Sequence, residues 1–184
     1  RQARATKQHC CKTIVCVPML TLVDKKTLFQ DRYQALIVPV PTSGIFRHRS
    51  LLRFQWLYRE HYQLYRQACD RAELALGGIL SSQTHRDLAG LGVGGALSKP
   101  KFIVNMAVTP FAENPPHLDY ILLALQQLEP MLYHWGRYGG IRRVALLASD
   151  ELIVPVGLSF EADILPRLQQ YLQPVSSLNV VVYR

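Results

Sequence analysis

The chain has 184 residues, of which 49% are hydrophobic and 18% are charged. This composition is typical of a folded globular protein and excludes disorder over the whole chain. The 21 lysines and arginines outnumber the 13 aspartates and glutamates, which leaves a formal net charge of +8. The excess of positive charge favours anionic partners such as nucleotides, nucleic acid or acidic protein surfaces.

The longest apolar runs are too short to cross a bilayer and no signal peptide pattern opens the chain, so we expect no membrane partner. The cysteines lack the paired spacing of a structural zinc site, and no element carries histidines at metal-ligand spacing. We therefore expect no metal and no cofactor. Thiols without a disulfide framework suit a reducing compartment, which favours an intracellular (cytoplasmic) protein. The cysteines are Cys10, Cys11, Cys16 and Cys69.

Residues 1–12 carry four basic side chains and no acidic one, which predicts a tail or linker. Residues 13–184 are expected to form one domain. Its organising feature is the apolar run Lys101–Val108, which indicates a strand buried on both faces. The other predicted strands are Thr13–Met19, Ala35–Val40, Ile79–Gln83, Arg143–Ala148 and Asn179–Tyr183. Residues 20–34 are expected to be an irregular connection.

Apolar residues at helical spacing predict three helices, Ser50–Asp70, Pro116–Trp135 and Phe160–Leu172. Strands and helices that alternate in this way indicate an α/β layer fold with a mixed, largely parallel sheet. Three local features refine the prediction. Ser50 is expected to cap its helix, Pro39 and Pro41 to end the second strand, and residues 149–159 to form a loop.

The glycine-rich run Gly90–Gly95 could be a phosphate-binding loop or a hairpin connection. A dinucleotide-binding loop follows a strand and opens a helix, whereas this run leads into a strand. We therefore interpret it as a flexible hairpin connection.

Three stretches resemble the macrodomain family: Tyr65–Leu74, Pro100–Asn105, and Gly140–Leu146 together with Val180–Tyr183. Within that superfamily the chain is similar to the antitoxin type, which removes ADP-ribose from DNA, and to relatives that act on ADP-ribosylated glutamate. The resemblance covers residues 26–184. It implies a three-layer α/β/α fold and a cleft for ADP-ribose.

The chain departs from the family in the stretches that bind the ligand. Lys26 and Thr27 stand where the family has a Gly-Asp or Gly-Asn pair for adenine, and Pro41 stands where an Asn faces the distal ribose. Thr109 occupies the place of the catalytic lysine of these relatives. The two phosphate loops correspond to residues 44–49, where only Gly44 keeps the pattern, and to residues 149–157, which are longer, bulkier and acidic.

A pyrophosphate is bound by backbone N–H groups that must approach closely, which is why such loops contain glycine. Phe46 and either Ile153 or Val154 are expected to crowd that space. The acidic pair Asp150 and Glu151 is expected to repel phosphate. The basic residues 47–49 could compensate through side-chain contacts to an anion.

No catalytic residue is assigned. The candidate ligand-binding residues are Gly44, Ile45, Phe46, Arg47, His48, Asn105, Thr109, Ser149, Asp150 and Gly157. Several have a structural alternative. Residues 47–49 could be a solvated basic turn, and Asn105 could satisfy neighbouring backbone groups. Asp150 and Glu151 are expected to point apart at a strand end, and His61 to be a hydrogen-bonded core histidine.

Three functions remain open. The first is a degenerate macrodomain that acts as a non-catalytic binding or interaction module, whose partner is ADP-ribose, another nucleotide, a protein chain or a neighbouring domain. The second is an active ADP-ribosyl hydrolase that reverses modification of DNA or protein. The third is nucleic-acid binding through the basic tail and the arginines between positions 47 and 71.

Overall fold

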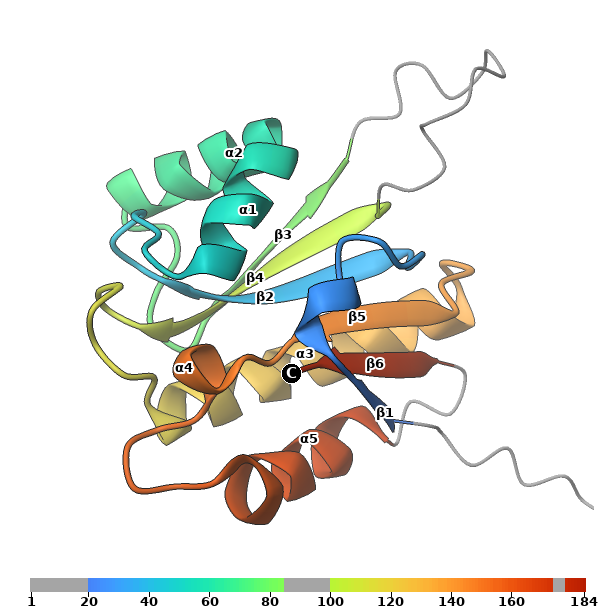
Figure 1. Ribbon diagram of the computed structural model, residues 1–184. Helices are drawn as coiled ribbons and strands as arrows, with labels where there is room; N and C mark the ends of the chain where they lie inside the picture. The colour runs from blue at the N-terminus through green and yellow to red at the C-terminus, as the bar shows by residue number, and fades with distance from the viewer. Residues whose placement is uncertain (1–19, 85–99, 174–177) are drawn as a thin grey trace, which may run out of the picture.

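The computed structural model describes residues 20–84, 100–173 and 178–184. These residues form one six-stranded sheet with the strand order β1-β6-β5-β2-β4-β3 (Figure 1). All neighbouring strands are parallel except β3 and β4, which are antiparallel. The mixed, largely parallel sheet predicted from the sequence is confirmed. The strands are β1 Leu20–Val23, β2 Ala35–Pro41, β3 Ile79–Gln83, β4 Phe102–Thr109, β5 Arg143–Leu147 and β6 Asn179–Tyr183.

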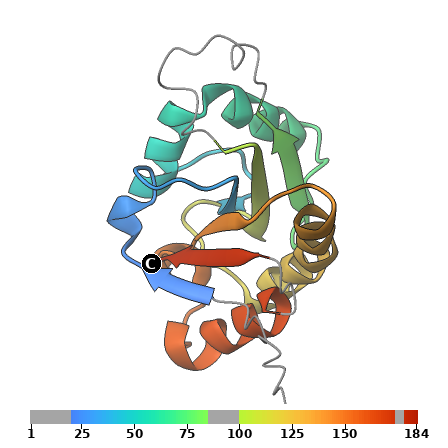
Figure 2. The same cartoon turned by 90° about the vertical axis from the view of Figure 1, so that its right-hand side faces the viewer.

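Helices cover both faces of the sheet, as Figures 1 and 2 show. The helices α1 (Arg49–Leu57) and α2 (Arg59–Asp70) lie on one face, and α3 (Leu118–Arg137) and α5 (Leu165–Leu172) on the other. Alternate strand residues point to opposite faces. In β2, for example, Ala35 and Ile37 pack toward α3, whereas Leu36 and Val38 pack toward α1 and α2. A strand covered twice must be apolar on both faces, which explains the unbroken apolar runs.

The helix predicted over Ser50–Asp70 is two helices that meet at Tyr58, whose φ of −124° and ψ of 57° are not helical. The interruption lets α1 bury Leu51 and Phe54 while α2 buries His61 and Tyr65 in the same core layer. The prediction that Ser50 caps the helix is wrong. His48 is the N-cap, because its Nδ1 accepts a hydrogen bond from the Ser50 backbone N–H at 3.2 Å.

Part of the segment expected to be irregular, residues 20–34, is in fact the edge strand β1. Its side chains are half-buried or exposed, so the strand depends on parallel pairing with β6 rather than on an apolar pattern. A short 3-10 turn, η1 (Lys25–Thr27), follows. The strand predicted over Thr13–Met19 lies outside the described residues. So do the basic tail and the glycine-rich run at 90–95, although antiparallel β3 and β4 have the pairing that a hairpin requires.

β2 runs to Pro41, one residue beyond the predicted end at Val40, so neither Pro39 nor Pro41 stops the strand before its last residue. β2 pairs with β5 only as far as Ile37. Pro39 and Pro41, which have no backbone N–H to donate, lie beyond the residues that pair with β5. The expected loop at 149–159 contains the short helix α4 (Asp150–Ile153). The last helix opens with a π-helical turn, η3 (Phe160–Ile164), ahead of Pro166, which has no N–H to donate. Within the described ranges, no helix is long and apolar enough to span a membrane.

Candidate ligand-binding site

The candidate site lies at the carboxyl ends of the parallel strands β2, β4 and β5. In open α/β sheets this edge is where ligands bind. The loops that follow these strands meet around a narrow cleft with a cavity volume of about 30 Å³. Binding pockets for small molecules usually have volumes of roughly 300–1,000 Å³. The cleft is lined by Pro39, Val40, Pro41, Arg47, His48, Leu51, Val108, Thr109, Ala112, Asn114, Pro116, Glu151 and Leu152.

His48 and Glu151 connect the loop after β2 with the loop after β5. The His48 Nε2 and the Glu151 Oε2 lie 3.1 Å apart. Because the His48 Nδ1 accepts the cap bond from Ser50, the imidazole proton is on Nε2, where it is donated to the carboxylate. We call this contact the His48–Glu151 bridge. It spans the mouth that the macrodomain resemblance assigns to a pyrophosphate.

Two further side chains complete the same network. The buried Ser149 hydroxyl donates to the Glu151 Oε2 at 2.8 Å and accepts a hydrogen bond from the Lys25 Nζ at 2.9 Å. The Lys25 Nζ is also 3.9 Å from the Glu151 Oε2. The hydrogen bond from Ser149 lowers the pKa of Glu151 to about 2, with further contributions from its own backbone N–H, Lys25 and His48. Glu151 is therefore a carboxylate at physiological pH.

An ion pair connects the loop after β4 with the loop after β2 at the same edge of the sheet. The Arg47 Nη2 lies 2.6 Å from the Glu113 Oε1. Thr109, at the end of β4, directs its hydroxyl to the carbonyl oxygens of Phe111 and Asn114, at 3.1 and 3.3 Å. The basic groups of residues 47 and 48 are thus paired with carboxylates, and the Thr109 hydroxyl is bonded within its own loop.

Two residues expected to crowd the cleft are packed elsewhere, so that expectation is wrong for both. Phe46 is 5% exposed and stacks on Tyr65, with ring centroids 5.0 Å apart, in the core under α2. Ile153 is buried in the core on the α3 face. Apolar burial explains both positions, because each side chain loses more water contact there than it would at an open mouth. Ile45, in contrast, is 56% exposed.

Asn105 also lies away from the cleft. It is fully buried in the middle of β4, where its Nδ2 is 3.0 Å from the His61 Nε2 on α2. The expectation that Asn105 satisfies neighbouring backbone is wrong, because its partner is a side chain. His61 is the hydrogen-bonded core histidine that was predicted, with Ser82 of β3 at its Nδ1. Burial lowers the pKa of His61 to about 4.

Asp150 points away from Glu151 and forms a bidentate ion pair with Arg184. The Arg184 Nε donates to the Asp150 Oδ1 at 2.8 Å and the Arg184 Nη2 donates to the Asp150 Oδ2 at 3.1 Å. The predicted divergence of the two carboxylates is confirmed, although they open α4 rather than end a strand. Gly44 and Gly157 both have positive φ, of 75° and 80°. Gly44 packs against α2, where an added Cβ would lie 3.4 Å from the Cys69 Cβ, whereas a Cβ at Gly157 would meet nothing within 4 Å.

The structure brings Arg47, His48, Thr109 and Ser149 together around one edge of the sheet and adds residues absent from the predicted set. Lys25, Glu113 and Glu151 are the charged additions. Lys25 and Glu113 lie in turns without a distinctive motif, so only their proximity to the cleft identifies them. Among the described residues, no cluster of three or more histidine, cysteine or acidic side chains could hold a metal ion.

Solved structures with the same fold identify the class of protein. The macrodomain of Thermus aquaticus DarG superposes with a TM-score of 0.71 and 23% identity, over 90% of this chain and 98% of that one. The macrodomain of Mycobacterium tuberculosis DarG gives a TM-score of 0.71 and 26% identity, over 90% and 97%. The chain therefore has the macrodomain fold, as the sequence resemblance implied.

Within that class, the chain is similar to DarG proteins. A curated relative, DNA ADP-ribosyl glycohydrolase of Thermus aquaticus, is 23% identical over 156 residues, which cover 85% of this chain and 39% of the relative. Thermosipho africanus DarTG, solved in complex with ADP-ribose, has a TM-score of 0.64 at 20% identity, over 84% of this chain and 39% of that one. No family model matches the chain. The chain thus corresponds to less than half the length of the curated relative.

Proposed function

We propose that this domain is a degenerate macrodomain that acts as an interaction module for a protein partner and does not hydrolyse ADP-ribosyl bonds. The observation that carries the proposal is the His48–Glu151 bridge across the mouth of the cleft. A macrodomain that binds a nucleotide diphosphate needs this mouth open and lined with donors. Here a carboxylate is held in it by Ser149, His48 and Lys25.

Charge in the cleft supports the proposal. A pyrophosphate brings two negative charges to a mouth whose loops already contain Glu113 and Glu151. Arg47 and His48, which could have compensated, lie 2.6 and 3.1 Å from those carboxylates. Phosphate binding would require these pairs to break before new ones form. The small volume of the cleft, about 30 Å³, acts in the same direction.

The chemistry at the end of β4 argues against catalysis. Thr109 occupies the place of a lysine in the enzymes that the sequence resembles, and a threonine hydroxyl does not titrate near neutral pH. Its oxygen is also directed to the carbonyls of Phe111 and Asn114. Thr109 therefore provides neither a proton for a leaving group nor a base that activates water.

An active ADP-ribosyl hydrolase is the alternative. It is favoured by the likeness to DNA ADP-ribosyl glycohydrolase and by the presence of an imidazole next to a carboxylate in the cleft. In that function, His48 and Glu151 would separate on binding and one of them would handle a proton. The alternative therefore requires the bridge to open with ligand.

Calorimetric titration with ADP-ribose, together with assays for release of ADP-ribose from modified DNA and modified protein, tests the proposal. The macrodomain of Thermus aquaticus DarG is the reference in both. We expect no heat and no release from this domain. Micromolar binding, which corresponds to about −8 kcal/mol, would overturn the closed cleft. Release of ADP-ribose would establish the hydrolase instead.

Variants of the His48–Glu151 bridge show whether the bridge prevents ADP-ribose from binding. His48→Ala combined with Glu151→Ala removes both partners and is expected to make ADP-ribose binding measurable. Asp150→Ala is the matched control, because Asp150 lies in the same loop but pairs with Arg184 outside the cleft. Equal behaviour of the two variants would mean that the bridge does not close the site.

A further inference from the structure

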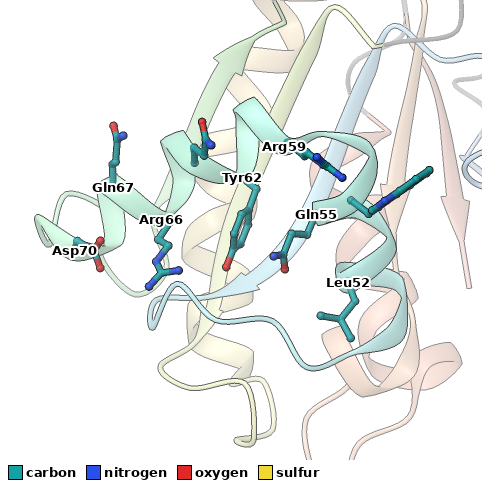
Figure 3. Close-up of a pocket in the computed structure, with 9 residues that line it drawn as sticks. Leu52, Gln55, Arg59, Tyr62, Arg66, Gln67 and Asp70 are labelled. Carbon is teal, nitrogen blue, oxygen red and sulfur yellow. The ribbon is translucent and has the colours of Figure 1, made fainter.

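A second hollow lies on the outer surface of α1 and α2, away from the cleft (Figure 3). Its cavity volume is about 640 Å³, far larger than that of the cleft. We call it the α1–α2 groove. Nine side chains line it: Leu52, Gln55, Trp56, Arg59, Tyr62, Gln63, Arg66, Gln67 and Asp70.

The groove has an ordered pattern of charge along α2. Arg59 and Arg66 are seven residues apart, which places them about 10 Å from one another along the helix on nearly the same side. Asp70 follows one turn beyond Arg66. Within the described part of the chain, neither arginine has a carboxylate within 4.0 Å. Two exposed guanidinium groups are thus available at a fixed separation.

The groove also presents apolar anchors over a rigid floor. Trp56 is 67% exposed and Leu52 is 47% exposed. Tyr62 is held in place, because its hydroxyl donates to the Gly44 carbonyl at 3.0 Å and its ring centroid lies 5.1 Å from that of Phe46. Exposed tryptophan and arginine beside a preorganised surface are features of residues that dominate binding energy at protein interfaces.

We propose that the α1–α2 groove binds an acidic, partly apolar segment of a partner protein. An apolar side chain of that segment packs against Trp56 and Tyr62. Carboxylates about 10 Å apart pair with Arg59 and Arg66, a separation that a helix provides between residues i and i+7. The end of the segment near Asp70 is basic or neutral. This inference rests on the proposed interaction function and adds the surface and the chemistry of the partner.

Two other occupants fit the groove less well. Single-stranded nucleic acid needs a continuous basic track and a series of stacking residues, whereas the lining has two arginines, one aspartate and one exposed tryptophan. In a two-fold dimer a second copy of the chain would present the same lining, so two arginines and one aspartate on each side would leave an excess of positive charge in the interface, which is unfavourable. An acidic segment complements the charge without either difficulty.

Fluorescence anisotropy with labelled synthetic peptides tests the proposal. One helical peptide carries two glutamates at i and i+7 around a leucine and phenylalanine centre, and a matched peptide carries lysines at the same two positions. We expect the glutamate peptide to bind the wild-type domain roughly tenfold more tightly than the lysine peptide. The double variant Arg59→Glu with Arg66→Glu should reverse that order, which a folding defect cannot do.

Controls make the outcome specific. Arg137→Glu changes an exposed arginine on α3, on the other face of the sheet, and should leave the preference unchanged. Trp56→Ala should weaken the glutamate peptide several-fold. Absence of any preference in the wild type, or a preference that survives the double variant, would overturn the proposal.

The competing occupants and the proposed function are separated by further measurements on the same preparations. Binding of an oligothymidylate that the double variant abolishes, without peptide binding, would assign the groove to nucleic acid. If sedimentation shows a dimer of the wild type that is absent from the double variant, the α1–α2 groove binds a second copy of the chain. Heat on titration with ADP-ribose would overturn the closed cleft whatever the peptides do, so the two failures are distinguishable.

Discussion

The His48 imidazole and the Glu151 carboxylate are 103 residues apart in the sequence and 3.1 Å apart in space. Each is oriented by a second contact, His48 by the Ser50 backbone N–H and Glu151 by the Ser149 hydroxyl. Because both partners are already positioned, their contact costs little additional side-chain entropy. The structure therefore positions both side chains for the contact that spans the mouth of the cleft.

Glu151→Gln is expected to lower the free energy of unfolding near neutral pH by less than about 1 kcal/mol, because the carboxylate is largely exposed. The pKa of Glu151 falls from 4.5 to about 2 on folding. A depressed carboxylate pKa contributes stability above the unfolded value, and that contribution is lost as the pH falls from 4.5 toward 2. Urea unfolding of both proteins at pH 6 and pH 3 checks this. A difference that is larger at pH 3 would contradict it.

His61 is expected to make the free energy of unfolding depend on pH between about 4 and 6.5, above the range in which Glu151 acts. Its pKa is about 4 in the folded protein and 6.5 when exposed, so the unfolded state binds more protons between these values. The wild type should lose on the order of 3 kcal/mol of stability from this group as the pH falls from 6.5 to 4. His61→Gln should flatten that dependence, measured by urea unfolding across the range. His134→Gln, at an exposed site on α3, is the control and should not flatten it.

Adjacent leucines on α1 provide a matched test of burial. Leu51 is 2% exposed and belongs to the core beneath α1, whereas Leu52 is 47% exposed and lines the α1–α2 groove. Leu51→Ala is expected to reduce stability by about 2–5 kcal/mol, because it leaves a cavity. Leu52→Ala should change it by less than about 0.5 kcal/mol. Thermal unfolding of the two variants measures both, and equal losses would mean that the side of α1 facing the core is assigned incorrectly.

Two glycines with positive φ separate backbone strain from steric conflict. A Cβ at Gly157 would meet nothing within 4 Å, so Gly157→Ala should cost about 1–2 kcal/mol from its φ of 80° alone. A Cβ at Gly77 would lie 2.9 Å from the Leu123 Cβ. Gly77→Ala should therefore destabilise the protein more than Gly157→Ala. Chemical denaturation of the pair tests the order, and the reverse order would contradict the packing of Gly77 on α3.

Much of the fold could be predicted because the relevant signals are local. β3 and β6 have the bounds expected from the sequence, and α3 differs by two residues at each end. Buried strands with two apolar faces and a long helix with an apolar stripe leave a clear pattern in the chain. β1 could not be found in this way. It is a half-exposed edge strand whose existence depends on β6, more than a hundred residues later.

The candidate site was predicted less completely. The loops after β2 and β5 were identified, and His48 and Ser149 do belong to the network at the sheet edge. The positions of Phe46 and Asn105 were misjudged, because the face to which a side chain points depends on packing with α2. The sequence does not identify Lys25, because the turn that contains it has no distinctive motif. Only the folded structure places η1 beside Ser149.

The sequence alone determined the layer architecture of this protein, because apolar periodicity is visible residue by residue. The absence of glycine at the positions of the phosphate loops is visible in the same way, and the macrodomain resemblance turns it into a prediction about the ligand site. Only the tertiary structure decided which charges meet. The bridge between His48 and Glu151 depends on how the loops after β2 and β5 close, and the α1–α2 groove depends on the break at Tyr58 between α1 and α2. Electrostatic contacts act over a few ångströms, and chain folding sets those distances across long separations in sequence.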